Sequence, residues 1–143
     1  MIAGIGIDIL SLNRFRNLLI KRDPYKIAKR ICTSNEFDLF KKLDIVSERN
    51  GNGNENSIEN KDELIEKQLK FLSSRWTLKE ASYKSLSNHL LKINWKDLEI
   101  NKNKNGSLNL YPIQKDHRDK FNLIASLSHD AGLIVGVVIA QFK

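Results

Sequence analysis

Several protein classes need features that this sequence of 143 residues lacks or has little of. It contains no run of about 18 apolar residues, so no membrane-spanning helix is predicted. Its single cysteine, Cys32, cannot form a disulfide within the chain and favours a reducing compartment. The first residues resemble neither a secretory signal peptide nor an organelle transit peptide. These absences argue against a secreted or membrane-spanning protein.

Two common ligand-binding motifs are missing as well. The three histidines and Cys32 lack the spacing of a zinc site. No histidine stands near Cys32 in the sequence to make it a nucleophile, so we expect a buried structural cysteine. Gly4 and Gly6 begin a pattern like that of dinucleotide-binding proteins, but Ile9 occupies the place of the third glycine. No βαβ repeat follows, which excludes a Rossmann fold.

The periodicity of apolar residues predicts the fold class. Alternation over residues 2–10 predicts a strand. Helical spacing and capping residues predict helices over 11–22, 24–32, 33–43 and 62–89. Strand patterns with turns at Asn105-Gly106 and 129–132 predict two hairpins, built from 95–100, 107–111, 121–128 and 133–142. We therefore expect a single α+β domain over residues 1–143, with an antiparallel sheet and helices packed on one face.

Residues 47–63 differ in composition from the rest of the chain. They are rich in Asn and Gly and nearly free of apolar side chains. Such a segment cannot bury enough surface to order itself. We predict a disordered surface insertion rather than a linker, because the flanking segments are too short to form separate domains.

The chain is basic, with a formal net charge of +7. This charge predicts an anionic partner: a nucleic acid, a phosphorylated cofactor or an acidic protein. A nucleic-acid-binding module would combine cations with exposed aromatic side chains on one face. The aromatic residues fall mostly on apolar helical stripes instead, and no helix-turn-helix or RNA-binding signature is present. A basic nucleic-acid-binding module is therefore the second hypothesis.

The segment 75–84 holds the densest group of chemically active side chains. Glu80 and Lys84 are four residues apart and share one helical face, as Arg75 and Lys79 share a neighbouring face. A carboxylate beside several cations suits a metal bound to a phosphate, because the carboxylate binds the metal and the cations bind phosphate oxygens. The alternative is a solvated helix with ordinary ion pairs.

Two further sites have both a structural and a functional interpretation. Asp8 ends the first strand, where it could cap the next helix, but the preceding Gly4 and Gly6 indicate close approach by a backbone or a ligand. His129, beside Asp130 at the end of a later strand, is either a turn histidine or a general base.

Five segments in a fixed order resemble holo-[acyl-carrier-protein] synthases, the small single-domain class of 4′-phosphopantetheinyl transferases. These segments are Gly4-Ile5-Gly6-Ile7-Asp8-Ile9, Arg30-Ile31-Cys32-Thr33 with Glu36, Arg75-Trp76 with Lys79-Glu80-Ala81 and Lys84, Trp95-Lys96-Asp97-Leu98-Glu99-Ile100, and Ser126-Leu127-Ser128-His129-Asp130. The resemblance covers nearly the whole chain except residues 44–67. Each motif alone is weak, whereas the ordered set is specific.

The resemblance implies Mg²⁺-dependent transfer of 4′-phosphopantetheine from coenzyme A to a serine of an apo acyl carrier protein, with release of 3′,5′-ADP. Asp8 and Glu80 match the family's magnesium ligands, and Lys84 matches a lysine at the phosphates. Arg75 and Lys79 would lie on the coenzyme side. His129 would activate the carrier serine, directly or through water, with Asp130 orienting it. These residues would form the catalytic, metal and coenzyme sites.

The resemblance also implies partners and an assembly. Arg14, Lys26 and Arg30 match a basic surface that docks the acidic carrier protein, although solubility alone could account for such cations. Similar small enzymes form homotrimers with the coenzyme at the subunit junction. Trp76, Tyr83 and the Asn/Gly-rich insertion resemble fungal mitochondrial members. The expected location is therefore the mitochondrial matrix for a fungal protein and otherwise the bacterial cytoplasm, with no nucleic-acid or membrane partner.

Overall fold

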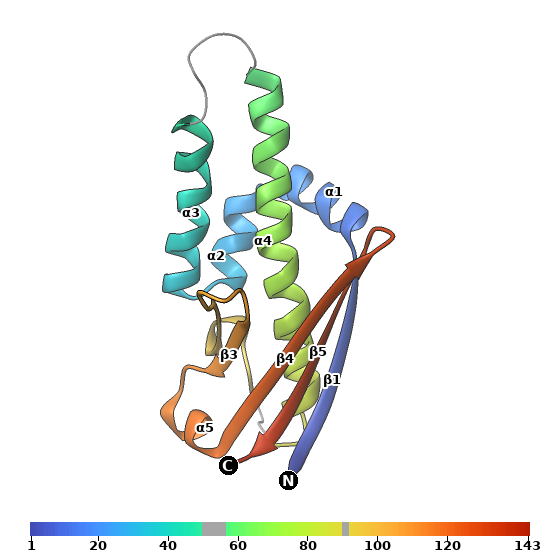
Figure 1. Cartoon of the computed structure of the whole chain (residues 1–143), viewed down its shortest axis with the longest axis vertical. Helices are drawn as coiled ribbons and strands as arrows, with labels where there is room; N and C mark the ends of the chain where they lie inside the picture. The colour runs from blue at the N-terminus through green and yellow to red at the C-terminus, as the bar shows by residue number, and fades with distance from the viewer. Residues whose placement is uncertain (50–56, 90–91) are drawn as a thin grey trace.

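The computed structural model describes residues 1–49, 57–89 and 92–143 (Figure 1). Its elements are, in order, β1 Ile2–Ser11, α1 Leu12–Arg22, α2 Pro24–Ile31, α3 Ser34–Arg49, α4 Ser57–Leu86, the 3₁₀ helix η1 Trp95–Asp97, β2 Leu98–Lys102, β3 Leu108–Pro112, α5 Lys115–Lys120, β4 Phe121–Asp130 and β5 Leu133–Phe142. None of the helices in these ranges combines the length and the apolar composition of a transmembrane span.

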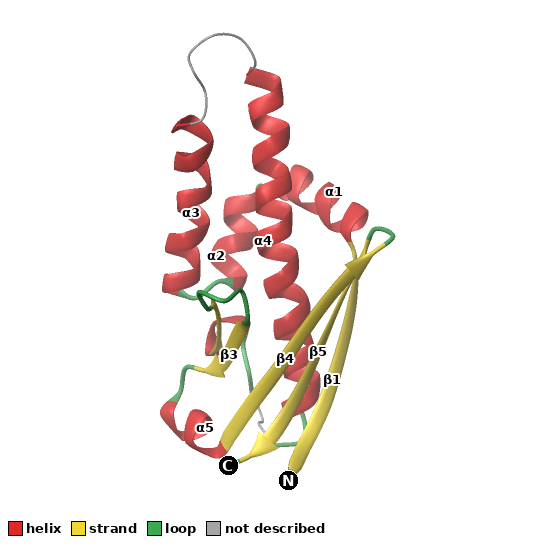
Figure 2. Ribbon diagram, viewed as in Figure 1, coloured by secondary structure: helices red, strands yellow, loops and turns green. Residues whose placement is uncertain are grey.

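The strands form one antiparallel sheet in the order β1-β5-β4-β3-β2. β1, β5 and β4 pair along strands of ten residues, whereas β3 joins β4 through the pair Leu110 and Leu123. The helices lie on one side of the long strands, and α4 packs against β1 and β5 (Figure 2). This arrangement confirms the predicted α+β fold.

Two glycines of β1 lie directly against the backbone of α4. A Cβ atom on Gly4 would lie 2.1 Å from the carbonyl oxygen of Ser85, and one on Gly6 would lie 1.8 Å from that of Ala81. Real Cβ atoms essentially never come within 3.0 Å of another heavy atom, so any larger residue would displace the helix. The predicted close approach at these glycines is therefore confirmed, with a helix as the neighbour.

Two apolar clusters hold the molecule together. One cluster lies between α4 and the sheet and includes Leu78 and Val138. The other lies among the helices α1, α2, α3 and α4 and includes Phe15 and Phe40. Each fully buried side chain of this size stabilises the fold by roughly 1.5–3 kcal/mol. Cys32 belongs to the helical cluster, and burial raises its pKa to about 12. The prediction of a buried structural cysteine is confirmed.

Side chains cap the helices where the sequence predicts. The Ser11 hydroxyl accepts a hydrogen bond from the Arg14 amide at 3.3 Å, at the start of α1. Thr33 and Glu36 form a capping box: the Glu36 amide donates to Thr33 Oγ1 at 3.2 Å, and the Thr33 amide donates to Glu36 Oε2 at 2.8 Å. These caps fix where α1 and α3 begin.

The helices extend farther than predicted at one end of the molecule. α3 continues to Arg49 and α4 begins at Ser57, so both helices extend into the segment 47–63, whose disorder stays a prediction. Residues 50–56 of that segment lie outside the described residues. α5 was not predicted, because its six residues have no apolar stripe.

The sheet face that points away from the helices is apolar and exposed. Gly4 and Gly6 point toward α4, so the alternate residues Ile5, Ile7 and Ile9 point away from it, with 56–61% of their surface exposed. Ile124 of β4 is 48% exposed. The register places alternate residues of β5 between these two strands. A contiguous apolar surface of this kind marks an interaction site.

Candidate functional site

The packing of β1 against α4 determines where Asp8 lies. Gly4 and Gly6 meet successive turns of α4, so two residues along the strand correspond to four residues back along the helix. The spacings match, because two strand residues span about 6.6 Å and four helical residues about 6.0 Å. Asp8 is two residues beyond Gly6 and therefore lies beside the helical turn that carries Glu80.

Lys84 lies one turn after Glu80 on α4 and connects the helix to β1. Its Nζ lies 2.8 Å from Asp8 Oδ1 and donates a second hydrogen bond to the Ile7 carbonyl oxygen at 2.9 Å. Glu80 lies four residues before Lys84, on the same face of α4. The fold therefore brings Asp8, Glu80 and Lys84 together, although Asp8 and Lys84 are 76 residues apart in the sequence.

The charges within this cluster do not balance. Burial and the nearby Asp8 carboxylate raise the pKa of Glu80, and Lys84 opposes that shift. Within the described residues, the Glu80 carboxylate makes no hydrogen bond or ion pair. Two carboxylates thus share one ammonium group. The excess negative charge favours a bound cation at this point.

Arg75 and Lys79 lie elsewhere on α4. Lys79 Nζ is buried and donates to Glu36 Oε2 at 2.6 Å and to the Ile31 carbonyl oxygen at 2.7 Å. Arg75 Nε lies 3.7 Å from Glu36 Oε1, and the guanidinium lies over the Phe71 ring. Both cations therefore contact the buried Glu36 within the helical layer, and their place on the coenzyme side stays a prediction.

Glu36 is a key residue that the sequence predicts only as a helix cap. It is fully buried, and its Oε1 also accepts a hydrogen bond from the Ile100 amide at 3.0 Å. The same carboxylate therefore joins α3, α4 and β2. The capping box was visible in the sequence, but the contact with Lys79 spans 43 residues and has no local signal.

His129 lies near the end of β4, on the helix-facing side of the sheet. Strand pairing connects His129 to Ile134 of β5, and Ile134 to Leu10 of β1. β5 therefore separates His129 from β1, and the Cα atoms of His129 and Asp8 are roughly 12 Å apart by strand geometry. Within one chain, the structure does not bring His129 to the Asp8–Glu80–Lys84 cluster.

Asp130 has a role in the turn that follows β4. Its Oδ1 accepts a hydrogen bond from the Ala131 amide at 2.8 Å. Ala131 and Gly132 both have positive φ, of 49° and 75°, as a tight two-residue hairpin turn requires. Asp130 thus stabilises the turn, and its predicted orientation of His129 stays a prediction.

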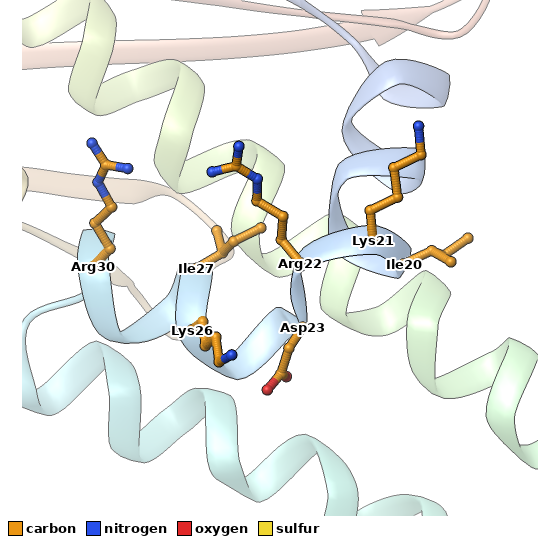
Figure 3. Close-up of a pocket in the computed structure, with 7 residues that line it drawn as sticks. All are labelled: Ile20, Lys21, Arg22, Asp23, Lys26, Ile27 and Arg30. Atoms are coloured by element: carbon orange, nitrogen blue, oxygen red, sulfur yellow. The ribbon is translucent and has the colours of Figure 1, made fainter.

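The predicted docking cations are exposed on α1 and α2. Lys26 and Arg30 line a shallow hollow between the end of α1 and α2 (Figure 3), together with Ile20, Lys21, Arg22, Asp23 and Ile27. Arg14 lies near the start of α1 and is not among these lining residues. The hollow combines four cations with one carboxylate and two isoleucines. It suits an acidic partner surface that also offers apolar side chains.

Comparison with known families identifies the chain. Residues 4–138 match the family model described as the 4′-phosphopantetheinyl transferase superfamily. The chain belongs to this superfamily. The match spans the Asp8–Glu80–Lys84 cluster and His129, and it confirms the resemblance inferred from the ordered motifs.

Relatives of similar length support the same assignment. The chain is 34% identical to a holo-[acyl-carrier-protein] synthase of Mycoplasma pneumoniae, over 99% of this chain and 95% of the relative. It is 32% identical to the protein of that name from Mycoplasma genitalium, over 99% and 97%. A holo-(acyl-carrier-protein) synthase structure from Bacillus anthracis, in complex with CoA (3′,5′-ADP), has a TM-score of 0.69 and 25% identity, covering 100% of this chain and 99% of that one.

The carboxylate pair fits the magnesium ion that this superfamily resemblance implies. Mg²⁺ usually binds proteins through one or two carboxylates and takes its other ligands from water and phosphate. Among the described residues, no group of three or more His, Cys, Asp or Glu side chains could hold a metal. Asp8 and Glu80 together would supply two ligands, and Lys84 lies beside them to meet a phosphate.

Proposed function

We propose that this protein transfers 4′-phosphopantetheine from coenzyme A to a serine of an apo acyl carrier protein. The serine oxygen forms a bond to the phosphorus that carries pantetheine, the bond from that phosphorus to the bridging oxygen of the pyrophosphate breaks, and 3′,5′-ADP leaves. Membership of the superfamily and the full-length relatives support this reaction. The residue roles below extend the proposal to this chain.

The observation that carries the proposal is the cluster of Asp8, Glu80 and Lys84. Asp8 and Glu80 would hold Mg²⁺, which when bound neutralises pyrophosphate charge and polarises the phosphorus. Lys84 would stabilise the phosphate that leaves with 3′,5′-ADP, because its ammonium lies beside the two carboxylates. The Lys84 side chain is 48% exposed, so it can reach a ligand that enters from solvent.

His129 would accept the proton of the carrier serine, directly or through a water molecule. Lys84 binds the carbonyl of Ile7 in β1, the terminal strand of the described sheet, whereas His129 lies on β4 beyond β5. A single chain therefore separates the proposed base from the proposed metal ligands. We place the site at a subunit junction, where His129 of the partner subunit faces the Asp8 cluster.

The exposed sheet face supports this assembly. Ile5, Ile7, Ile9 and Ile124 form an apolar surface that another copy of the chain could cover. We propose a homotrimer with three such junctions. The carrier protein would dock on Arg14, Lys26 and Arg30, whose positive charge speeds encounter with an acidic partner.

The relatives also bear on location and on the second hypothesis. Those described above are bacterial, which supports the proposed bacterial cytoplasm; they give no support to a mitochondrial matrix protein. Many aromatic rings of the described residues pack inside the helical layer, as in the pair of Phe15 and Trp76. No observation favours a nucleic-acid-binding module.

Replacing Glu80 tests the metal assignment. The Glu80→Ala variant should keep its fold but lose transfer to an apo acyl carrier protein, measured as the mass gained by the carrier in the presence of coenzyme A and Mg²⁺. Glu63→Ala is the matched control, because Glu63 lies on the same helix in an exposed ion pair with Lys67. Normal turnover by Glu80→Ala would contradict the assignment, whereas Glu63→Ala should retain the rate of the unmodified protein.

A further inference from the structure

We propose that Lys84 holds the metal site closed until the coenzyme arrives, so that the divalent ion and the pyrophosphate bind together. This inference rests on the proposed function, because it assumes that Asp8 and Glu80 are metal ligands. In the structure, Lys84 Nζ lies 2.8 Å from Asp8 Oδ1, so the ammonium group and a divalent ion would compete for the same carboxylate.

The position of Lys84 is fixed by two contacts rather than one. Its ammonium also donates to the Ile7 carbonyl oxygen at 2.9 Å, so it is held at the strand and not only attracted by charge. A divalent ion that binds Asp8 alone must displace this ammonium or tolerate its repulsion at close range. Either outcome weakens metal binding in the absence of a phosphate ligand.

A pyrophosphate removes this obstacle. Its oxygens offer the Lys84 ammonium a new anionic partner and give the metal the ligands that two carboxylates cannot supply. Lys84 is half exposed and carries a flexible four-carbon stem, so it can turn from Asp8 to a phosphate without movement of the backbone. The substrate species that the site favours is therefore the complex of the divalent ion with coenzyme A.

Binding of Mn²⁺ by the protein without coenzyme or carrier tests the inference directly. The probe is the metal alone, and free Mn²⁺ is counted by electron paramagnetic resonance. Lys84→Met should bind Mn²⁺ about tenfold more tightly than the unmodified protein, a change of about 1.4 kcal/mol. Lys84→Gln, which removes the charge and keeps a polar side chain, should show the same direction. With saturating coenzyme A, the advantage of both variants should disappear.

Two controls separate the possible failures. Lys102→Met removes an equal charge from an exposed position on β2 and should leave Mn²⁺ affinity unchanged. Asp8→Asn should weaken Mn²⁺ binding below that of the unmodified protein, and Lys84→Met should not restore it in the double variant. Equal or weaker Mn²⁺ affinity in both Lys84 variants, with Asp8→Asn still defective, would overturn the role of Lys84 and leave the metal site intact. Unchanged binding in Asp8→Asn would instead refute the metal site and the proposed function's metal assignment.

Discussion

Enlarging Gly6 would separate the two elements that form the proposed metal site. A Cβ atom at this position would lie 1.8 Å from the Ala81 carbonyl oxygen, which is 1.6 Å closer than the 3.4 Å at which ordinary contact begins. Overpacking costs about 1–3 kcal/mol, and the upper value applies because backbone rather than a flexible side chain must move. Alanine is otherwise favoured over glycine in a strand by roughly 0.5–1 kcal/mol. We expect a net loss of about 2 kcal/mol for Gly6→Ala.

Two assays at one fixed protein concentration measure this effect. Urea unfolding should show the lower stability, and thermal unfolding a fall of roughly 8 °C. The transfer rate should fall further than stability predicts, because a shift of about 1 Å between Glu80 and Asp8 can cost on the order of a hundredfold in rate. Gly136→Ala is the graded comparison and should cost less, because its Cβ would lie 2.9 Å from the Thr77 methyl group rather than 1.8 Å from a carbonyl oxygen. A Gly6→Ala variant with unchanged stability and rate would refute the packing argument.

Three further predictions follow from other contacts. Glu36→Gln should lower the free energy of unfolding, measured in urea, by about 3 kcal/mol, because it leaves Lys79 and Arg75 buried without a carboxylate. The double variant with Lys79→Met should recover part of this loss. A single variant as stable as the unmodified protein would contradict the prediction. Arg14→Glu should raise the KM for the carrier protein more than that for coenzyme A, and equal effects would refute the docking role. Burial raises the pKa of Glu99, but its hydrogen bonds, of which that from Tyr111 is the largest, lower the pKa by more. The net pKa of Glu99 therefore lies below the usual 4.5. Glu99 therefore contributes stability above pH 4.5 that is lost as the pH falls through its folded pKa, so the stability deficit of Tyr111→Phe at pH 7 should shrink in acid; a deficit independent of pH would contradict it.

Local sequence patterns predict most of the fold. Asn105-Gly106 marks the hairpin between β2 and β3, the Thr33–Glu36 box marks the start of α3, and alternation identifies β1. The predicted helix ends at residues 43 and 62 were wrong, because both helices continue into a polar segment that has no periodic apolar signal. α5 was missed because six polar residues have no periodic signal.

The candidate site was only partly predictable. The glycines before Asp8 indicated a close neighbour, and the spacing of Glu80 and Lys84 indicated a shared face. Only the family resemblance joined Asp8 to that face, because the two segments are 76 residues apart. Lys79 occupies the adjacent position to Glu80 yet points into the core, because its direction depends on Glu36, which is distant in the sequence. A local motif cannot distinguish a cation that meets a ligand from one that meets a buried carboxylate.

The most direct test of the proposed function is the intact mass of an apo acyl carrier protein after incubation with this protein, coenzyme A and Mg²⁺. The account predicts a gain of one phosphopantetheine on the carrier, which disappears when EDTA removes the metal. No gain with any of several bacterial carriers, from a folded sample, would contradict the transfer reaction. A gain that persists in EDTA would contradict the role of Asp8 and Glu80 as metal ligands.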